Sequence, residues 1–289
     1  MNFLRDIFSL LREAASQWME DNAPQQGAAL AFYSLLSLAP LLMIAIAIAA
    51  LFFGEDAARG ELKDQLKDMV GVDGAKAAES LLENAKKPQS GILATVIGVA
   101  TLLFGASGVF GQLQQAMNTI WDAPPRKSSG VWSILRGRIL SFAMVLVIGF
   151  LLLASLVLSA AIAGAGEYLG GIVPGLEAWL QTANTVASFF IVTLLFAAIY
   201  KVLPDTKIAW RDVWIGAILT SLLFTIGKLG IGLYLGKSGM ASAYGTAGSL
   251  VVLIVWVYYS AQILFFGAEL AHVYSKRHGS RAPKANASQ

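Results

Sequence analysis

The chain contains no cysteine and only two histidines among its 289 residues. Without cysteine it can form no disulfide, no thiolate metal site and no cysteine nucleophile. A zinc site needs about three or four histidine, cysteine or carboxylate ligands, and a hydrolytic triad needs a histidine base. His272 and His278 both lie near the C-terminal end, so neither site can form within the long apolar stretches. We therefore expect no enzyme activity, no bound metal and no cofactor.

Charged residues are also scarce. They make up 13% of the chain, whereas an ordinary soluble domain has about 25%. The formal net charge is only +3, and the basic residues are spread along the chain instead of forming a run, so we expect no nucleic-acid partner. Hydrophobic residues account for 56% of the sequence, which favours a protein whose solvent is the membrane.

Six long apolar stretches occupy about half of the chain, and few charged residues fall inside them. They run over residues 28–53, 92–117, 139–163, 185–203, 213–235 and 246–270. A helix of about 20 apolar residues crosses a hydrocarbon core of about 30 Å. Backbone groups left unpaired in lipid are costly, so each crossing should be a helix. The sequence predicts an all-α fold, a polytopic membrane bundle of six transmembrane helices within a membrane domain at 28–274.

Three further segments lie outside the six apolar stretches and differ from them in sequence pattern. Residues 1–27 carry apolar side chains at three and four residue spacing, which predicts an amphipathic helix lying along the membrane interface. Residues 55–87 alternate charged and apolar residues, and we expect a helical hairpin between the first two spans; a solvated linker is the alternative. Residues 275–289 are predicted to be a disordered, basic cytoplasmic tail.

The positions of the basic residues predict the orientation. Lysine and arginine occur before the first span and in the segments after the second, fourth and sixth spans, whereas none lies between the third and fourth. Basic residues are enriched in cytoplasmic loops, and this bias places both termini in the cytoplasm. Tryptophans at positions 121, 132, 210 and 214 fall at predicted inner ends, as interfacial aromatics should.

Irregularities within the first, second and fifth spans are the first candidates for a transport pathway. Pro40 lies in the first span and should interrupt its helical hydrogen bonding. Gln112, Gln115 and Asn118 make the end of the second span polar, and an unpaired amide in hydrocarbon is costly. Lys228 lies within the fifth span, where a charge costs about 3 kcal/mol unless it pairs, faces water or snorkels to the interface.

The sixth span adds Tyr258, Gln262 and Glu269 to these pathway candidates. Glu269 and His272 lie one helical turn apart near its inner end. They are either a solvated cytoplasmic cap or a proton-sensitive pair.

Basic residues near predicted inner ends are candidates for binding anionic lipid headgroups. They are Arg126, Lys127, Arg136, Arg138, Lys207 and Arg211. The positive-inside rule alone also accounts for such residues, so both interpretations stand.

Four passages resemble the YihY/BrkB family of bacterial inner-membrane proteins. They are GAALAFYSLLSLAPLL (27–42), FGQLQQAMNTIW (110–121), LPDTKIAWRDVWIGA (203–217) and YGTAGSLVVLIVWVYYSAQILFFGAEL (244–270). The resemblance implies a six-span protein of the bacterial inner membrane with proposed roles in envelope-related export or transport. Family members have often been labelled ribonuclease BN, but this sequence has nothing to hold the metals of a zinc-dependent nuclease.

Two classes of function follow. The first is a transporter, exporter or flippase of a lipid or small envelope-related molecule, which would pass along broken helices and their polar residues. The second is a non-transporting envelope scaffold that binds partners or sister subunits through its glycine-rich helix faces, forming a homo-oligomer in the latter case. Membrane lipids are the expected partners in either class.

Overall fold

In the computed structural model every regular element among the described residues is a helix, which confirms the all-α class. These residues are 2–57, 59–60, 62–63, 75–76, 78–80, 82–83, 108–124, 176–237 and 248–282. Within these ranges there is no β-strand. The predicted stretch at 139–163 and most of that at 92–117 lie outside them. The count of six spans therefore remains a prediction.

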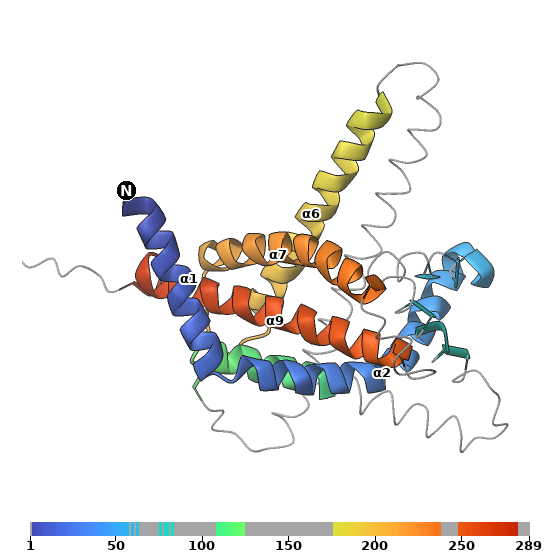
Figure 1. The fold of residues 1–289 in the computed structure, drawn as a ribbon, viewed down its shortest axis with the longest axis horizontal. Coiled ribbons are helices and arrows are strands. Elements are labelled where there is room, and N and C mark those ends of the chain that lie inside the picture. The colour runs from blue at the N-terminus through green and yellow to red at the C-terminus, as the bar shows by residue number, and fades with distance from the viewer. Residues whose placement is uncertain are drawn as a thin grey trace, which may run out of the picture. The chain divides into compact units, whose positions relative to one another are not determined.

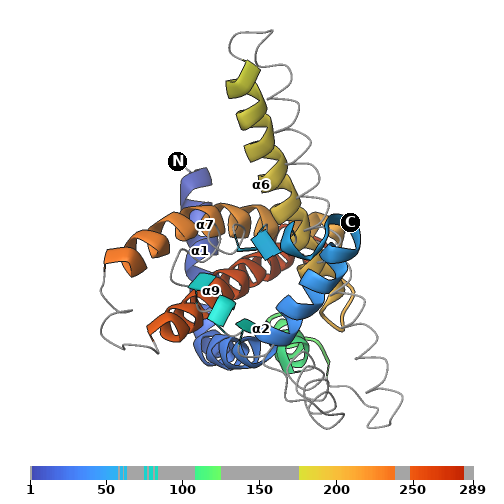
Figure 2. The same cartoon turned by 90° about the vertical axis from the view of Figure 1, so that its right-hand side faces the viewer.

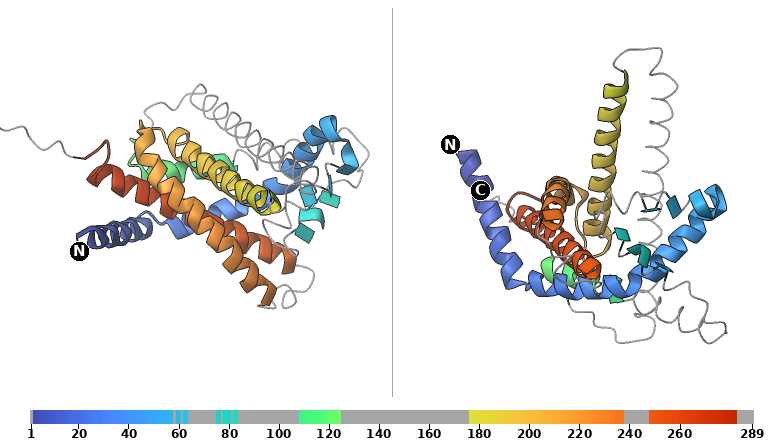
Figure 3. Two further views of the ribbon diagram at one scale, coloured as in Figure 1. Left: turned by 90° about the horizontal axis from the view of Figure 1, so that it is seen from above. Right: turned by 45° about the vertical axis from the view of Figure 1, so that its right-hand side comes forward.

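The first two helices are separated by a short break. Helix α1 covers Asn2–Glu20, and α2 covers Ala23–Phe53, so α2 starts earlier than the predicted span. Asn22 has a left-handed backbone (φ 54°), which asparagine tolerates better than most residues. A proline in the first turn of α2 favours the new start, because its missing N–H would have no helical partner there. Helix α2 continues through Pro40, and its ribbon changes direction along its length (Figure 3).

Three long helices follow in the second half of the chain: α6 (Leu176–Val202), α7 (Trp210–Lys237) and α9 (Gly248–Arg277). A shorter helix covers residues 108–120. By length and composition, two segments among the described residues can cross a membrane, Trp179–Val202 with 24 residues and Leu250–Arg277 with 28.

The chain divides into two compact units, each assembled from separate parts of the sequence. The α6 unit comprises Met1–Gln17, Met117–Ser221 and Phe266–Gln289. The α2 unit comprises Trp18–Ala116 and Leu222–Phe265. Helices α1, α7 and α9 each contribute residues to both units. Figure 1 labels the long helices along the chain.

In the α6 unit, α9 contacts α1 and α7. Ala14 of α1 is fully buried against Leu270 and Val273 of α9. Gly216 of α7 faces the carbonyl of Gly267 so closely that no Cβ would fit between the two helices. Small residues permit this close backbone approach.

Helix α6 packs on α7 mainly through its C-terminal half. The Tyr200 hydroxyl lies 2.7 Å from the Thr220 hydroxyl. Toward the N-terminal end, α6 extends away from the other described helices of its unit (Figure 3). Trp179 and Val186 are 76% and 63% exposed there, so their apolar side chains are not covered by the described part of the chain.

In the α2 unit, the helix at 108–120 runs beside α2 (Figures 1 and 2). Gly108 lies directly against the ring of Tyr33. Helices α7 and α9 meet again in this unit, where the rings of Phe224 and Trp256 are 5.9 Å apart. Trp256 is 5% exposed, so its role in this unit is packing.

The described parts of the predicted hairpin at 55–87 are helical and contact one another. The Lys63 ammonium lies 2.9 Å from the Glu79 carboxylate. Ala78 and Leu82 are buried against Leu42 and Ile46 of α2. These apolar contacts show that the hairpin segment packs on α2, the helix that precedes it.

The C-terminal end of α9 extends beyond the predicted boundary at residue 275. The helix continues to Arg277, and the turn formed by residues 278–282 is held by hydrogen bonds to other segments of the α6 unit. Composition alone favoured a disordered tail because the segment is basic and polar. Specific partners for Ser280 and Arg281 order its first part.

Candidate functional site

A cluster of glutamine side chains lies in the α2 unit. The Gln112 amide nitrogen, on the helix at 108–120, donates a hydrogen bond to the Gln26 side-chain oxygen of α2 at 3.0 Å. Both residues lie on elements rich in apolar side chains, where an amide favours a polar partner. The sequence pointed to Gln112 but not to Gln26, although Gln25 and Gln26 form a conspicuous polar pair just before the first apolar stretch.

Gln262 approaches the same part of α2 from α9. A Cβ at Gly27 would overlap the amide nitrogen of Gln262 and lie 3.5 Å from the Ala261 Cβ. The two helices are therefore in direct contact, and a side chain at position 27 would have to displace the Gln262 amide. The side-chain nitrogen and oxygen of Gln262 are both buried without a hydrogen-bond partner among the described residues. Leaving a buried polar group unpaired costs about 1–3 kcal/mol, so such a group calls for a reason.

The other candidates of the α2 unit lie on α2, α7, α9 and the helix at 108–120. Tyr258 lies on α9 and is partly buried, and Gln115 is exposed. Pro40 and Lys228 lie within α2 and α7, and their side chains are outside the described residues. Whether Lys228 faces a pathway or the interface stays a prediction.

Asn118 belongs to the α6 unit and has a structural partner. Its side-chain nitrogen donates to the Asp205 carboxylate at 2.8 Å, and its side-chain oxygen accepts the Asp205 backbone N–H at 2.7 Å. This reciprocal pair joins the end of the helix at 108–120 to the turn between α6 and α7. Asn118 is thus accounted for by the fold.

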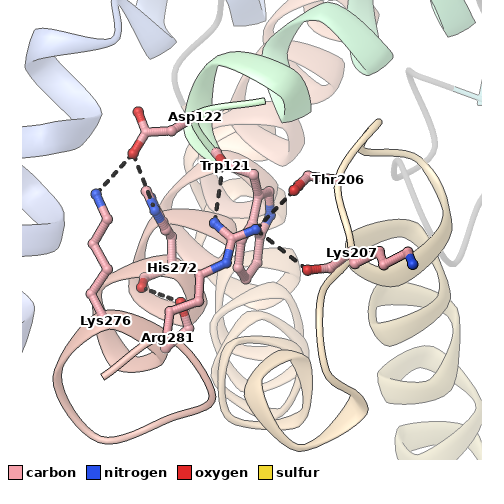
Figure 4. A network of polar contacts seen from close by, with 8 residues as sticks. Trp121, Asp122, Thr206, Lys207, His272, Lys276 and Arg281 are labelled. Atoms are coloured by element: carbon pink, nitrogen blue, oxygen red, sulfur yellow. Dashed lines mark hydrogen bonds and ion pairs between the residues drawn. The ribbon is translucent and has the colours of Figure 1, made fainter. Parts of the chain in front are cut away.

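A second polar network surrounds the C-terminal end of α9 (Figure 4). Asp122 has a left-handed backbone (φ 50°) just after the helix at 108–120. Its carboxylate accepts a hydrogen bond from the Lys276 ammonium at 2.8 Å, and the same oxygen lies 3.5 Å from the His272 Nε2 atom. His272 packs against the buried ring of Trp121, with ring centroids 5.3 Å apart.

The Lys276 hydrogen bond lowers the pKa of the Asp122 carboxyl below its usual value. With a lowered pKa, the ionised pair stabilises the fold above a pH of about 4. That contribution is lost as the pH falls through the folded-state pKa. The effect is small because the Asp122 side chain is 65% exposed.

The turn at residues 278–282 contributes Ser280 and Arg281 to this network. The Arg281 guanidinium donates to the Trp121 carbonyl at 3.2 Å and to the Thr206 hydroxyl at 3.0 Å, and it lies over the Trp121 ring at 5.4 Å. Ser280 donates its backbone N–H at 3.1 Å, and also its hydroxyl, to the carboxylate of Asp212, a fully buried residue. A side chain at Gly279 would overlap that carboxylate.

We expect both Arg281→Lys and Arg281→Ala to lower the free energy of unfolding by about 1–3 kcal/mol. Either change removes the planar guanidinium group, which donates hydrogen bonds to both the Trp121 carbonyl and the Thr206 hydroxyl. Thermal unfolding in detergent, followed by tryptophan fluorescence, measures the effect. The matched control is Lys207→Ala, since the Lys207 side chain points away from the network (Figure 4). Unchanged unfolding of Arg281→Lys would show that charge alone holds the turn.

Glu269 and His272 lie together on the buried side of α9. Glu269 is 0% exposed and His272 is 2% exposed. Such burial does not fit a solvated cytoplasmic cap, which assumed that the end of the sixth stretch was open to water. The hypothesis of a proton-sensitive pair stays a prediction.

Of the candidate headgroup-binding residues, Lys207 and Arg211 are described and both are exposed. Arg126, Lys127, Arg136 and Arg138 lie outside the described residues. In the described part of the chain, no group of three or more histidine, cysteine, aspartate or glutamate side chains is arranged to hold a metal ion.

The sequence did not single out Arg281, Asp205 or Asp212 as members of a site. Asp212 offered one signal, because an acidic residue in the first turn of a helix is favoured by the helix dipole. The other two depend on contacts between segments far apart in the chain, which no local pattern reveals.

Helices long and apolar enough to cross a bilayer, together with the relatives below, define an all-helical membrane protein. The chain belongs to the BrkB family, because residues 14–289 match the family described as Virulence factor BrkB. This membership confirms the resemblance found in the sequence.

Several relatives are described as UPF0761 membrane proteins. The one from Ralstonia nicotianae is 26% identical over 267 residues, covering 91% of this chain and 58% of the relative. The one from Alteromonas mediterranea is 27% identical over 292 residues, covering 97% and 93%. The one from Rhodospirillum centenum is 28% identical, and the chain spans 57% of its length. No solved structure matches the chain.

Proposed function

We propose that this membrane protein is a transporter, exporter or flippase that moves a lipid or small envelope-related molecule across the bacterial inner membrane. In this proposal the chain crosses the membrane six times with both termini in the cytoplasm. In this proposal it carries out no catalytic reaction and uses no cofactor; the sequence offers no thiolate and only two histidines for such chemistry.

The buried amide of Gln262 is the observation that supports transport. It offers a donor and an acceptor inside an apolar helical unit, beside the α2 segment that holds the Gln26–Gln112 pair. A purely structural bundle gains nothing from an unpaired amide, which lowers its stability. A passing polar group can form the missing hydrogen bonds, which explains why a polar residue stands at this position.

The test is reconstitution of the purified chain into liposomes that carry a panel of cargos. The panel comprises labelled phosphatidylglycerol, labelled phosphatidylcholine and small anionic and neutral solutes. We expect at least one cargo to cross faster than in protein-free liposomes. If none crosses faster, the transport proposal fails and the scaffold class takes its place.

A further inference from the structure

The short segment from Lys201 to Asp212 joins α6 to α7 and contains three basic and two acidic residues. In sequence, Lys201, Lys207 and Arg211 are interspersed with Asp205 and Asp212, so the local charge looks nearly balanced. The structure separates these charges, placing the acids against protein and leaving Lys207 and Arg211 at the surface.

Both acids are engaged by side chains of the α6 unit. Asp205 is paired with Asn118 through two hydrogen bonds. Asp212 is fully buried and accepts hydrogen bonds from Ser280. Neither carboxylate is placed to neutralise the bases on the surface of this segment.

Backbone carbonyls of the turn between α6 and α7 accept hydrogen bonds from Arg281 and Lys201, which hold the backbone of the turn in place. Arg281 donates to the Thr206 hydroxyl and, at 3.4 Å, to the Lys207 carbonyl. The Lys201 ammonium donates to the Ile208 carbonyl and lies 5.9 Å from the centre of the Trp210 ring. Figure 4 shows the Lys207 side chain directed away from the network.

The resulting surface combines two exposed cations with an exposed aromatic ring. Lys207 and Arg211 are exposed and form no ion pair with a side chain in the described part of the chain. Trp210 is 48% exposed between them in sequence. Along α7, Arg211 continues into exposed apolar residues at three and four residue spacing, namely Ile215 and Ile218.

We propose that Lys207, Trp210 and Arg211 form a binding site for the headgroup of an anionic phospholipid, whose acyl chain lies along Ile215 and Ile218. The two cations attract the phosphate, and Trp210 lies at the level where headgroup and hydrocarbon meet. The apolar row on the same helix face favours a lipid over a free anion. This site does not depend on the proposed transport function.

The absence of cysteine allows a local measurement. A single cysteine introduced by Ala209→Cys and labelled with an environment-sensitive dye places a reporter within the segment. The labelled full chain, in neutral detergent, is titrated with phosphatidylglycerol, phosphatidylcholine or inorganic phosphate. We expect phosphatidylglycerol to bind at least tenfold more tightly than phosphatidylcholine, and phosphate not to displace it at equal concentration.

The variant Lys207→Ala/Arg211→Ala should weaken phosphatidylglycerol binding about thirtyfold and leave phosphatidylcholine binding unchanged. Lys63→Ala/Lys76→Ala is the matched control, because it removes the same charge from the segment that follows α2 and should leave the titration unchanged. Helix content measured by circular dichroism confirms that each variant is folded. Equal affinity of the wild type and the Lys207→Ala/Arg211→Ala variant, equal binding of the two lipids, or displacement by phosphate would each overturn the proposal.

Discussion

Replacing Gln262 with methionine should raise the thermal unfolding midpoint of the protein in detergent. Methionine keeps the length of the unbranched side chain, so the contact with Gly27 is retained. It removes a buried nitrogen and a buried oxygen that have no hydrogen-bond partner among the described residues. We expect a gain of about 1–3 kcal/mol, the usual cost of an unpaired buried polar group.

The matched control for this prediction is Gln181→Met on α6, where the glutamine is exposed. A surface substitution of this kind changes stability by less than about 0.5 kcal/mol. Both variants are compared with the wild type by thermal unfolding at the same lipid and detergent ratio. A lower midpoint for Gln262→Met would mean that the amide stabilises the fold, and the energetic argument for a functional role would fail.

Gly216→Ala should destabilise the protein by about 1–3 kcal/mol or more through overpacking. The added Cβ would overlap the carbonyl oxygen of Gly267 and lie 2.6 Å from the Cβ of Ala271. Because the nearest obstacle is backbone, α7 and α9 must move apart to make room. The intrinsic preference of helices for alanine over glycine, about 1 kcal/mol, offsets only part of this cost.

Gly230→Ala, in the same helix, provides the control. No atom lies within 4 Å of a Cβ at Gly230 among those the structure describes, so only the helix preference acts and the variant should be slightly more stable. Chemical unfolding of the two variants, followed by circular dichroism, separates the effects by sign. Two variants with the same change in stability would show that α7 and α9 are not packed as closely at Gly216 as the structure indicates.

Local patterns predicted the long helices of the described residues well, because helix formation in apolar segments depends on near neighbours in sequence. The amphipathic spacing before residue 20 corresponds to α1, and four of the long apolar stretches overlap α2, α6, α7 and α9 over most of their length. The boundaries were less accurate. The start of α2 depends on Asn22 and the proline that follows it, and the end of α9 depends on partners for Ser280 and Arg281.

The candidate site was predictable only in part, because composition does not say which polar side chains meet. Gln112 and Gln115 looked equivalent in the sequence, yet Gln112 donates a hydrogen bond to Gln26 and Gln115 is exposed. Asn118 belongs to a structural pair with Asp205. Glu269 is buried because its helix is covered there by other parts of the α6 unit, which a hydropathy pattern cannot show.

The most direct test of the account compares cargo flux through liposomes that contain either the wild type or Gln262→Met, at equal protein content and with Gln181→Met as the control. For the cargo that the wild type moves, the account predicts a rate reduced by about tenfold or more in Gln262→Met, because one lost hydrogen bond to the passing group is worth roughly 1.4 kcal/mol. Gln181→Met should match the wild type. Equal flux in all three proteins would contradict the role of the Gln262 amide in transport.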